Sequence, residues 1–499
     1  MASNTEPIVQ QLQQDFQALL GYVTGPEAQT QSAYSVELTL FRRVLALGAA
    51  LLQLFFVSRA AVRPEAPRLT PDGPELPYHD QRPVSYYSVF GKLSFERHYF
   101  YAAGAGGCCP LDAELSLPAG CYSDLLREWL DYDGTDGAYR ETASTALRIL
   151  GLKLSIQALE TMMQADAGDV TAFYDQLAEP PVPPAVGSIL VVQADGKGVP
   201  MVQPRGESPP LRLGKGQKRG KKKEAVVTSV YTVAPYGRTP QEVLSALLRE
   251  VRASEPEPAR RPQPVNKELH ATLDGKELAI SRLQERAARR EGPELQDRVA
   301  LSDGAEALQQ QLQHHFPHYS LVLDIIHASE YLWDSANALL GEKHPQRTAW
   351  VRSRLGQLLQ GDTEAVITDL AELTNEPRRS AVQIETLHKT IGYYRRNLPY
   401  MRYDHYLARG WPIGTGVIEG ACGHLVKDRM EQGGKVPGAA GMRWTKDGAQ
   451  AVLDLRGVRL SGDWDAYWQF HRNQQHARLY GTASSAPVTV ELQVLQLAA

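Results

Sequence analysis

Two short apolar runs in this chain each end in an aspartate followed directly by glycine. The first, "SILVVQADG", contains Leu190–Val192 and Asp195, and the second, "RVALSDG", contains Asp303. Adjacent rather than alternating apolar residues are typical of strands buried on both faces of a sheet. Open α/β sheets place their ligands at the carboxyl ends of such strands. An ionised carboxylate there is costly unless a cation meets it, so the pattern predicts an α/β core with a cation near both aspartates.

A third carboxylate, Glu419, lies much later in "WPIGTGVIEGACGHLVKDRM". Glycines and Thr415 can cap a helix there, and the neighbours of Glu419 are small or apolar, which is unusual for a glutamate on a solvated face. Mg²⁺ prefers oxygen ligands, and two such ions can stabilise the attacking and the leaving oxygen of a phosphoryl transfer. We therefore expect Asp195 to bridge two Mg²⁺ ions and Asp303 and Glu419 each to complete one. For each acid taken singly, the alternative is a helix cap or a surface ion pair.

A strongly basic segment follows the first aspartate. From Arg212 to Lys223, "RLGKGQKRGKKK" holds seven lysines or arginines in twelve residues and no acid. We expect a loop whose cations contact phosphates, with an ordinary solvated loop as the alternative. The net charge of −4 gives no argument for nucleic acid over the whole chain, so the case rests on local residues. The expected DNA-binding residues are Lys215, Lys218, Arg219, Lys221, Lys222 and Lys223, with Lys427 and Arg429 after Glu419.

Proline and glycine punctuation divides the chain into six regions. The one strongly apolar stretch, Val44–Val57, is too short to span a membrane and is expected to be a buried helix. Four cysteines in 499 residues form no disulfide framework, which favours a reducing, cytoplasmic compartment. Ser155 is expected to cap the second helix of a helix-turn-helix-like pair, although an ordinary helical hairpin has the same spacing. The expected regions are N-terminal helices (1–62), a proline-rich linker with a short β region (63–121), a helix-turn-helix-like DNA-binding region (122–185), the first part of the core (186–330), a helical insertion (331–411), and the last core helix with the C-terminal tail (412–499).

Four segments, "ADGKGVPM", "LSDGAEAL", "LDIIHASEYLW" and "PIGTGVIEGACGHLVKDRM", together resemble bacterial insertion-sequence transposases of the ISKra type. The resemblance implies an RNase H-like catalytic fold, a mixed sheet flanked by helices, with the acidic triad of the DDE group at Asp195, Asp303 and Glu419. "DIIH" is similar to a C/D-x-x-H signature of related Mutator-like transposases. That similarity implies that Asp324 and His327 adjoin the site and support it rather than react.

The resemblance implies a DNA transposase that cleaves and joins strands with two Mg²⁺ ions, for which Mn²⁺ can substitute. Its partners would be double-stranded DNA and further copies of the chain, as a homodimer or larger oligomer in the bacterial nucleoid. Two features depart from the relatives. Cys108 and Cys109 are adjacent instead of spaced as in a zinc knuckle, so no zinc is predicted. Residues 433–440 look like an insertion, which leaves a catalytically inactive DNA-binding descendant as the main alternative. A glycosidase with paired carboxylates is disfavoured by the basic segment.

Overall fold

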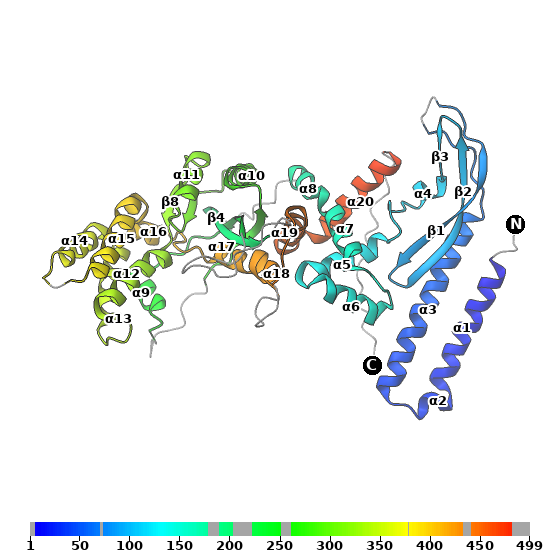
Figure 1. Ribbon diagram of the computed structural model, residues 1–499, viewed down its shortest axis with the longest axis horizontal. Coiled ribbons are helices and arrows are strands. Elements are labelled where there is room, and N and C mark those ends of the chain that lie inside the picture. The colour runs from blue at the N-terminus through cyan, green and yellow to red at the C-terminus, as the bar shows by residue number, and fades with distance from the viewer. Residues whose placement is uncertain are drawn as a thin grey trace, which may run out of the picture. The chain divides into compact units, whose positions relative to one another are not determined.

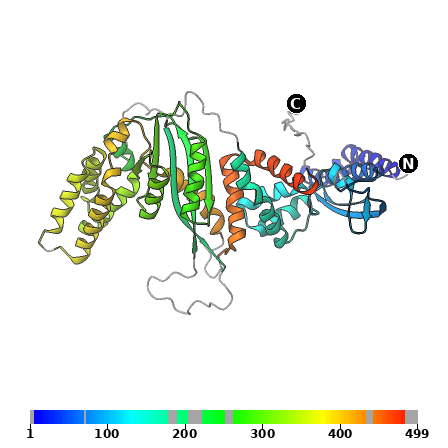
Figure 2. The same ribbon diagram turned by 90° about the horizontal axis from the view of Figure 1, so that it is seen from above.

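The structure, a computed structural model, describes residues 5–69, 73–177, 189–202, 222–250, 261–377, 379–432 and 441–481. The chain forms two compact units. The first contains the residues up to 175 together with those from 464 onward, and the second contains residues 176–463 (Figures 1 and 2).

The first unit begins with a helical hairpin. α1 (Glu6–Thr24) leads through the short α2 (Pro26–Gln29) into α3 (Ala33–Ala60), which packs beside α1 (Figure 1). The Ser32 hydroxyl caps α3 by accepting a hydrogen bond from the Ser35 amide. Within the described ranges, α3 is the one helix that is long and apolar enough to cross a membrane.

α3 is not the buried helix that the sequence suggested for Val44–Val57. Only Phe56 is buried, and its ring stacks on that of Phe95 with 4.3 Å between the centroids. Just 6% of the most apolar 18 residues of the helix are buried. The prediction was wrong because hydropathy measures how apolar a helix is but does not show which other elements pack against it.

A small antiparallel sheet follows the hairpin. Its strands are β1 (Tyr78–Ser88), β2 (Gly91–Ala102) and β3 (Gly106–Cys108), in that order across the sheet. α3 packs on β2, and the short α4 (Pro110–Glu114) packs near it. Phe90, at the turn between β1 and β2, covers α3 so closely that a Cβ on Gly48 would lie 2.6 Å from its ring.

Helices complete the first unit. α5 (Asp124–Asp136), α6 (Tyr139–Leu150) and α7 (Ile156–Asp166) precede η1 (Ala167–Asp169) and α8 (Val170–Gln176). The Ser155 cap of α7 is confirmed, since its hydroxyl accepts from the Ala158 amide. The last helix, α20 (Trp464–Tyr480), also belongs to this unit. Its buried His471 lies 2.7 Å from Asp169 and 3.2 Å from Asp166, so this part of the expected C-terminal core region packs elsewhere.

The second unit is built on a five-stranded mixed sheet in the order β6-β5-β4-β7-β8. Its strands are β4 (Ile189–Pro200), β5 (Lys222–Val233), β6 (Val265–Thr272), β7 (Asp297–Ser302) and β8 (Ser320–Leu323). β4, β7 and β8 are parallel, whereas β5 is antiparallel to both of its neighbours. Residues 189–192 are fully buried, as expected for a strand covered on both faces. The mixed α/β class is thereby confirmed.

Helices cover the two faces of this sheet. α10 (Lys276–Ala288) and α11 (Glu306–His315) pack with Leu190 and Val192 on one face. On the other face, Ile189 and Val191 join a large apolar cluster that also contains residues of α9 (Pro240–Leu247) and of the long helical segment after β8. That segment comprises α12 (Ile325–Leu340), α13 (Arg347–Leu359), α14 (Thr363–Thr374), α15 (Ala381–Asn397), η2 (Leu398–Tyr400) and α16 (Tyr403–Ala408).

The helix that carries Glu419 contains an unusual turn. α17 (Gly416–Ala421) continues as a π-helical turn, η3 (Cys422–Lys427), and ends with α18 (Asp428–Met430). A π-turn leaves backbone carbonyls without their usual α-helical partners. Arg456 of α19 (Lys446–Ser461) donates to the carbonyls of His424 and Leu425, so a buried guanidinium stabilises this turn.

Candidate active site

Three aspartates occupy equivalent positions on the three parallel strands. Gln193 of β4 pairs with Leu301 of β7, and Asp195 and Asp303 each follow two residues later. Ser302 pairs with Leu323 of β8, so Asp303 and Asp324 follow their strands at the same level. Because neighbouring strands lie about 4.8 Å apart, this register brings the three carboxylates to one edge of the sheet.

Asp324 is an internal anchor of that edge. Its side chain is fully buried and caps α12 by accepting from the Ile326 amide at 2.8 Å. Its other oxygen accepts hydrogen bonds from His327 Nδ1, at 2.8 Å, and from the Thr415 hydroxyl. Each oxygen of this carboxylate therefore already accepts at least one hydrogen bond from the protein.

His327 is held as a cation beside Glu419. Its hydrogen bond to Asp324, together with the charges of Asp324, Glu330 and Asp303, raises the pKa of His327 to about 9 against the opposing effect of burial. Its Nδ1 also lies 3.6 Å from Oε1 of Glu419. At neutral pH the imidazolium therefore offsets part of the negative charge of this edge.

Glu419 reaches the same edge because two contacts hold the start of α17. Gln193, fully buried in β4, accepts a hydrogen bond from the Ile418 amide at 2.9 Å. The Thr415 hydroxyl contacts both Asp324 and Oε1 of Glu419, the latter at 3.1 Å. The Glu419 side chain itself remains 45% exposed, so it can meet a ligand from solvent.

Cys422 contacts Asp195 from the first position of the π-turn. Its Sγ lies 3.2 Å from Oδ2 of Asp195, and the other oxygen of Asp195 accepts from the Gly196 amide at 2.6 Å. Burial raises the pKa of the Cys422 thiol far above its ordinary value, and the charge of Asp195 adds to this effect. The sulfur therefore stays protonated and donates to the carboxylate.

The loop of Asp303 is held by the helical segment after β8. Tyr393 of α15 donates to the Asp303 carbonyl at 2.8 Å, and Arg396 donates to the Gly304 carbonyl at 2.9 Å. Gly304 has φ +88°, and a Cβ there would lie 2.6 Å from the Tyr393 hydroxyl oxygen. Only glycine fits this turn without strain, which explains why glycine follows the aspartate.

The ligand geometry differs in part from the sequence hypothesis. Among the described residues, Asp324, His327 and Glu419 form the one group of three ligand atoms that lie within 4.8 Å of one another and could hold a metal ion. Asp195 and Asp303 lie at the same edge but outside this tight group. Sequence reasoning assigned Asp324 and His327 a supporting position, and the structure brings both into direct contact with the Glu419 region.

The expected DNA-binding residues have different surroundings. Lys215, Lys218, Arg219 and Lys221 lie outside the described residues. Lys222 and Lys223 begin β5, where Lys222 forms an ion pair with Glu431, and Lys427 is exposed on the π-turn. Arg429 is fully buried, with its guanidinium 4.7 Å from the centre of the Trp444 ring. Its assignment to DNA was wrong, because the π-turn directs it into the core.

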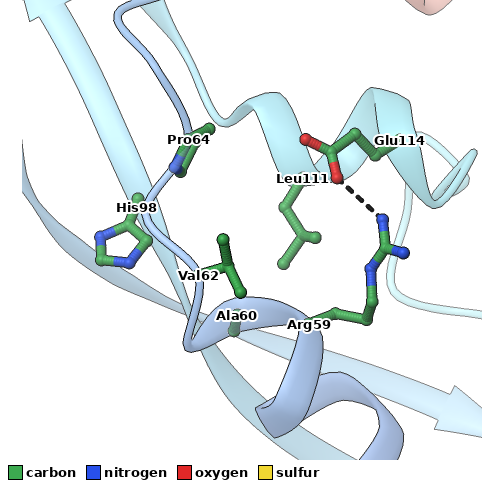
Figure 3. Close-up of a pocket in the computed structure, with 7 residues that line it drawn as sticks. All are labelled: Arg59, Ala60, Val62, Pro64, His98, Leu111 and Glu114. Atoms are coloured by element: carbon green, nitrogen blue, oxygen red, sulfur yellow. Dashed lines mark hydrogen bonds and ion pairs between the residues drawn. The ribbon is translucent and has the colours of Figure 1, made fainter. Parts of the chain in front are cut away.

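A separate pocket of about 290 Å³ lies in the first unit, bordered by the end of α3 (Figure 3). Arg59 and Glu114 form an ion pair at its edge, and Val62, Pro64 and Leu111 supply apolar walls. Both charged side chains are about half exposed, so they form an ordinary surface pair. This pocket lacks the converging acids of the sheet edge and is the weaker candidate.

Sequence reasoning missed three residues that position the site: Gln193, Thr415 as a side-chain donor, and Cys422. A polar Gln193 within an otherwise apolar strand was the one available signal.

No known family model matches the chain, and no curated protein matches it.

Proposed function

We propose that this protein is a DNA transposase of the DDE group with an RNase H-like catalytic core. The observation that best supports the proposal is the alignment of Asp195, Asp303 and Asp324 on adjacent parallel strands, with Glu419 held at the same edge. The sheet topology also supports it. Numbered within the sheet in chain order, the strands run 3-2-1-4-5, with only the second antiparallel to its neighbours.

Asp195, Asp303 and Glu419 would hold two Mg²⁺ ions, because carboxylate oxygens are the ligands that this hard cation prefers. When bound, the ions would activate a water or a 3′-hydroxyl and stabilise the leaving oxygen. The side chains fit this role, since each is at least partly accessible and one oxygen of Asp195 is held only by a thiol, a weak donor. Asp324 fits this role less well than these three, because it is fully buried and amide, imidazole and hydroxyl donors contact its oxygens.

The remaining residues of the edge position these three acids. Thr415 fixes the Glu419 side chain, and Gln193 fixes the start of its helix against β4. His327 supplies a positive charge 3.6 Å from Glu419, which lowers the mutual repulsion of the carboxylates before a metal binds. Tyr393 and Arg396 hold the backbone that carries Asp303.

DNA contact is proposed for the basic segment 212–223 rather than for the helices around α7. Each phosphate contact by a lysine or arginine releases a condensed counterion and so strengthens binding at low salt. Residues 122–177, which include α5 to α8, carry four basic and ten acidic residues, a formal charge of 4 − 10 = −6. This charge disfavours the approach of a phosphate backbone.

Nicking of supercoiled plasmid in Mg²⁺ or Mn²⁺ tests the proposal. We expect wild type to nick, and Asp195→Asn, Asp303→Asn and Glu419→Gln each to reduce the rate at least about a thousandfold, because each removes a metal ligand. Glu364→Gln is the matched control, since Glu364 is an exposed acid on α14 that holds no place in the proposed site.

Three outcomes would contradict the proposal. Wild type that binds DNA without nicking in either metal would favour the inactive descendant. Triad variants that nick as well as wild type would exclude the two-metal assignment. Activity lost with Asp324→Asn but kept with Asp195→Asn and Asp303→Asn would place the metal at the tight group of Asp324, His327 and Glu419 instead.

A further inference from the structure

The second half of α15 and the residues that follow it are basic. From Thr386 to Tyr403 the chain contains no acid and four exposed lysines or arginines: Lys389, Arg395, Arg396 and Arg402. Within the part of the chain that the structure describes, Lys389, Arg395 and Arg402 form no ion pair with an acid. Arg396 forms one with Glu306, at the long distance of 3.9 Å. Such a run of uncompensated cations attracts an anion from outside the chain.

Two of these cations flank the tyrosine that holds the Asp303 loop. Lys389 lies four residues before Tyr393 and Arg396 three residues after it, so the three side chains follow one face of α15. Tyr393 donates to the Asp303 carbonyl, and Arg396 donates to the carbonyl of the next residue. The Lys389 ammonium lies 5.5 Å from the centre of the Tyr331 ring, which stacks on Tyr393 at 3.9 Å. The basic face therefore begins beside Asp303.

Gly392 leaves an open position in the middle of this face. A Cβ built on it would meet no atom of the described chain within 4 Å, and its φ is not positive. Neither packing nor backbone geometry requires a glycine there, although glycine destabilises the middle of a helix relative to alanine. A glycine also lets a ligand approach the backbone closely. Basic side chains lie three or four positions away on both sides: His388, Lys389, Arg395 and Arg396.

The dimensions of this face suit the phosphates of a DNA strand. At about 1.5 Å per residue, Lys389 and Arg396 lie about 10 Å apart along the helix axis. A strand of duplex DNA rises about 3.4 Å per nucleotide, so about three successive phosphates fit along this length. A phosphodiester that reaches Asp303 is joined to further phosphates of the same strand. The surface beside Asp303 therefore meets anions at this spacing.

We propose that α15 binds the phosphates that flank the phosphodiester at the sheet edge. We call its binding residues the α15 face: His388, Lys389, Gly392, Arg395 and Arg396. The inference rests on the proposed function, because it places the DNA substrate of that same site. The cations contact phosphate oxygens without reading sequence, and Gly392 lets the strand lie close to the helix. The α15 face adds a second set of phosphate contacts to those proposed for residues 212–223.

Fluorescence anisotropy of the full-length protein with a labelled DNA duplex tests the α15 face. The titrations are made without divalent metal, so that no cleavage occurs, and over a series of salt concentrations. Lys389→Gln/Arg395→Gln should reduce the slope of log K against log salt by about 1.8, because each of the two lost phosphate contacts contributes about 0.9. Gly392→Gln should weaken binding at least about tenfold yet raise the melting temperature, because its side chain fills the space of the strand and favours the helix.

Two control variants match these changes. Lys267→Gln/Lys343→Gln removes two exposed lysines, one from β6 at the opposite side of the sheet from β8 and one from the turn after α12. It should leave the slope unchanged. Gly21→Gln fills a glycine of α1 that is equally open but has no lysine or arginine within four positions. It should raise the melting temperature without weakening DNA binding.

The outcomes separate this inference from the proposed catalysis. Wild type that nicks plasmid, with an unchanged salt slope in Lys389→Gln/Arg395→Gln or unweakened binding by Gly392→Gln, overturns the α15 face alone. The same follows if the control variants lose as much binding as the variants of α15. Wild type that binds DNA and shows both predicted losses, but does not nick, contradicts the catalysis and keeps the α15 face. Wild type that binds no DNA contradicts both. Thermal melting shows whether each variant is folded, and Gly392→Gln keeps the test decisive if the double variant is not.

Discussion

Replacing Asp324 by asparagine tests whether the charge of this residue holds the sheet edge together. Asparagine keeps an oxygen for the Ile326 amide and is an equally good helix cap. It removes the negative charge that His327 and Thr415 contact. The substitution therefore separates electrostatics from capping and packing at a fully buried position.

The sign and size of the effect follow from the pKa of His327. The hydrogen bond to Asp324 raises that pKa most, and with the charges of Asp324, Glu330 and Asp303 it reaches about 9 from an ordinary value of 6.5. A raised pKa stabilises the folded state fully below pH 6.5, and this stabilisation is lost as the pH rises through about 9. At 1.36 kcal/mol per pKa unit, the difference of 9 − 6.5 gives about 3.4 kcal/mol. His327 keeps 30% of its side chain exposed, and Glu330 and Asp303 supply part of the shift, so the value expected for Asp324 alone falls to about 2 kcal/mol.

Urea unfolding of wild type and Asp324→Asn at pH 6 and pH 10 measures this contribution. We expect the variant to be about 2 kcal/mol less stable at pH 6 and equal to wild type, or slightly more stable, at pH 10. Other buried acids with raised pKa values, Asp131 and Asp454, titrate identically in both proteins and cancel in the difference. His327→Gln, alone and combined with Asp324→Asn, completes a double-mutant cycle. An equal loss of stability at both pH values would refute the electrostatic account.

Three further outcomes are expected. Gly304→Ala should destabilise the protein by about 2–4 kcal/mol in urea unfolding, because it strains a turn of positive φ and meets Tyr393; an effect below about 0.5 kcal/mol would contradict this reason. Replacing the five basic residues between 218 and 223 by glutamine should flatten the plot of log K for DNA against log salt by about 0.9 per lost phosphate contact, and an unchanged slope would exclude the segment from binding. Asp195→Asn should leave the metal-free melting temperature unchanged or raised, yet reduce the increase that Mg²⁺ gives to wild type; the opposite pattern would mark Asp195 as a structural residue.

The carboxyl ends of the parallel strands were predictable because their signal is local. A buried apolar run followed by aspartate and glycine specifies a strand and its end within a few residues, as Asp195 and Asp303 illustrate. The mixed α/β class follows from the same runs. The partners of these acids were not predictable, because Thr415 and Cys422 reach them through contacts across 91 and 227 positions of the chain.

The wrong predictions have a common physical origin. Val44–Val57 and Arg429 were assigned by composition, the first as buried because it is apolar and the second as exposed because it is charged. The structure reverses both, since α3 packs on one side only and the Arg429 guanidinium is covered by Trp444. Burial depends on which elements pack together, and neither hydropathy nor charge carries that information.

The π-turn also determines how insertions and deletions act on this chain. Successive residues of an α-helix are about 100° apart around its axis, so removing one residue from an ordinary helix rotates everything beyond it by about that angle. A π-turn holds one residue more than an α-helical turn, so a one-residue deletion within 422–427 would return the segment to α-helix and leave the direction of Arg429 relative to Glu419 nearly unchanged. Ten positions separate Glu419, which faces solvent, from Arg429, which faces Trp444. The helix between them therefore fixes the angle between the two side chains around its axis. An inserted residue could not be absorbed in this way and, without a second bulge, would turn one of the two side chains away from its place, although the helical propensity would barely change.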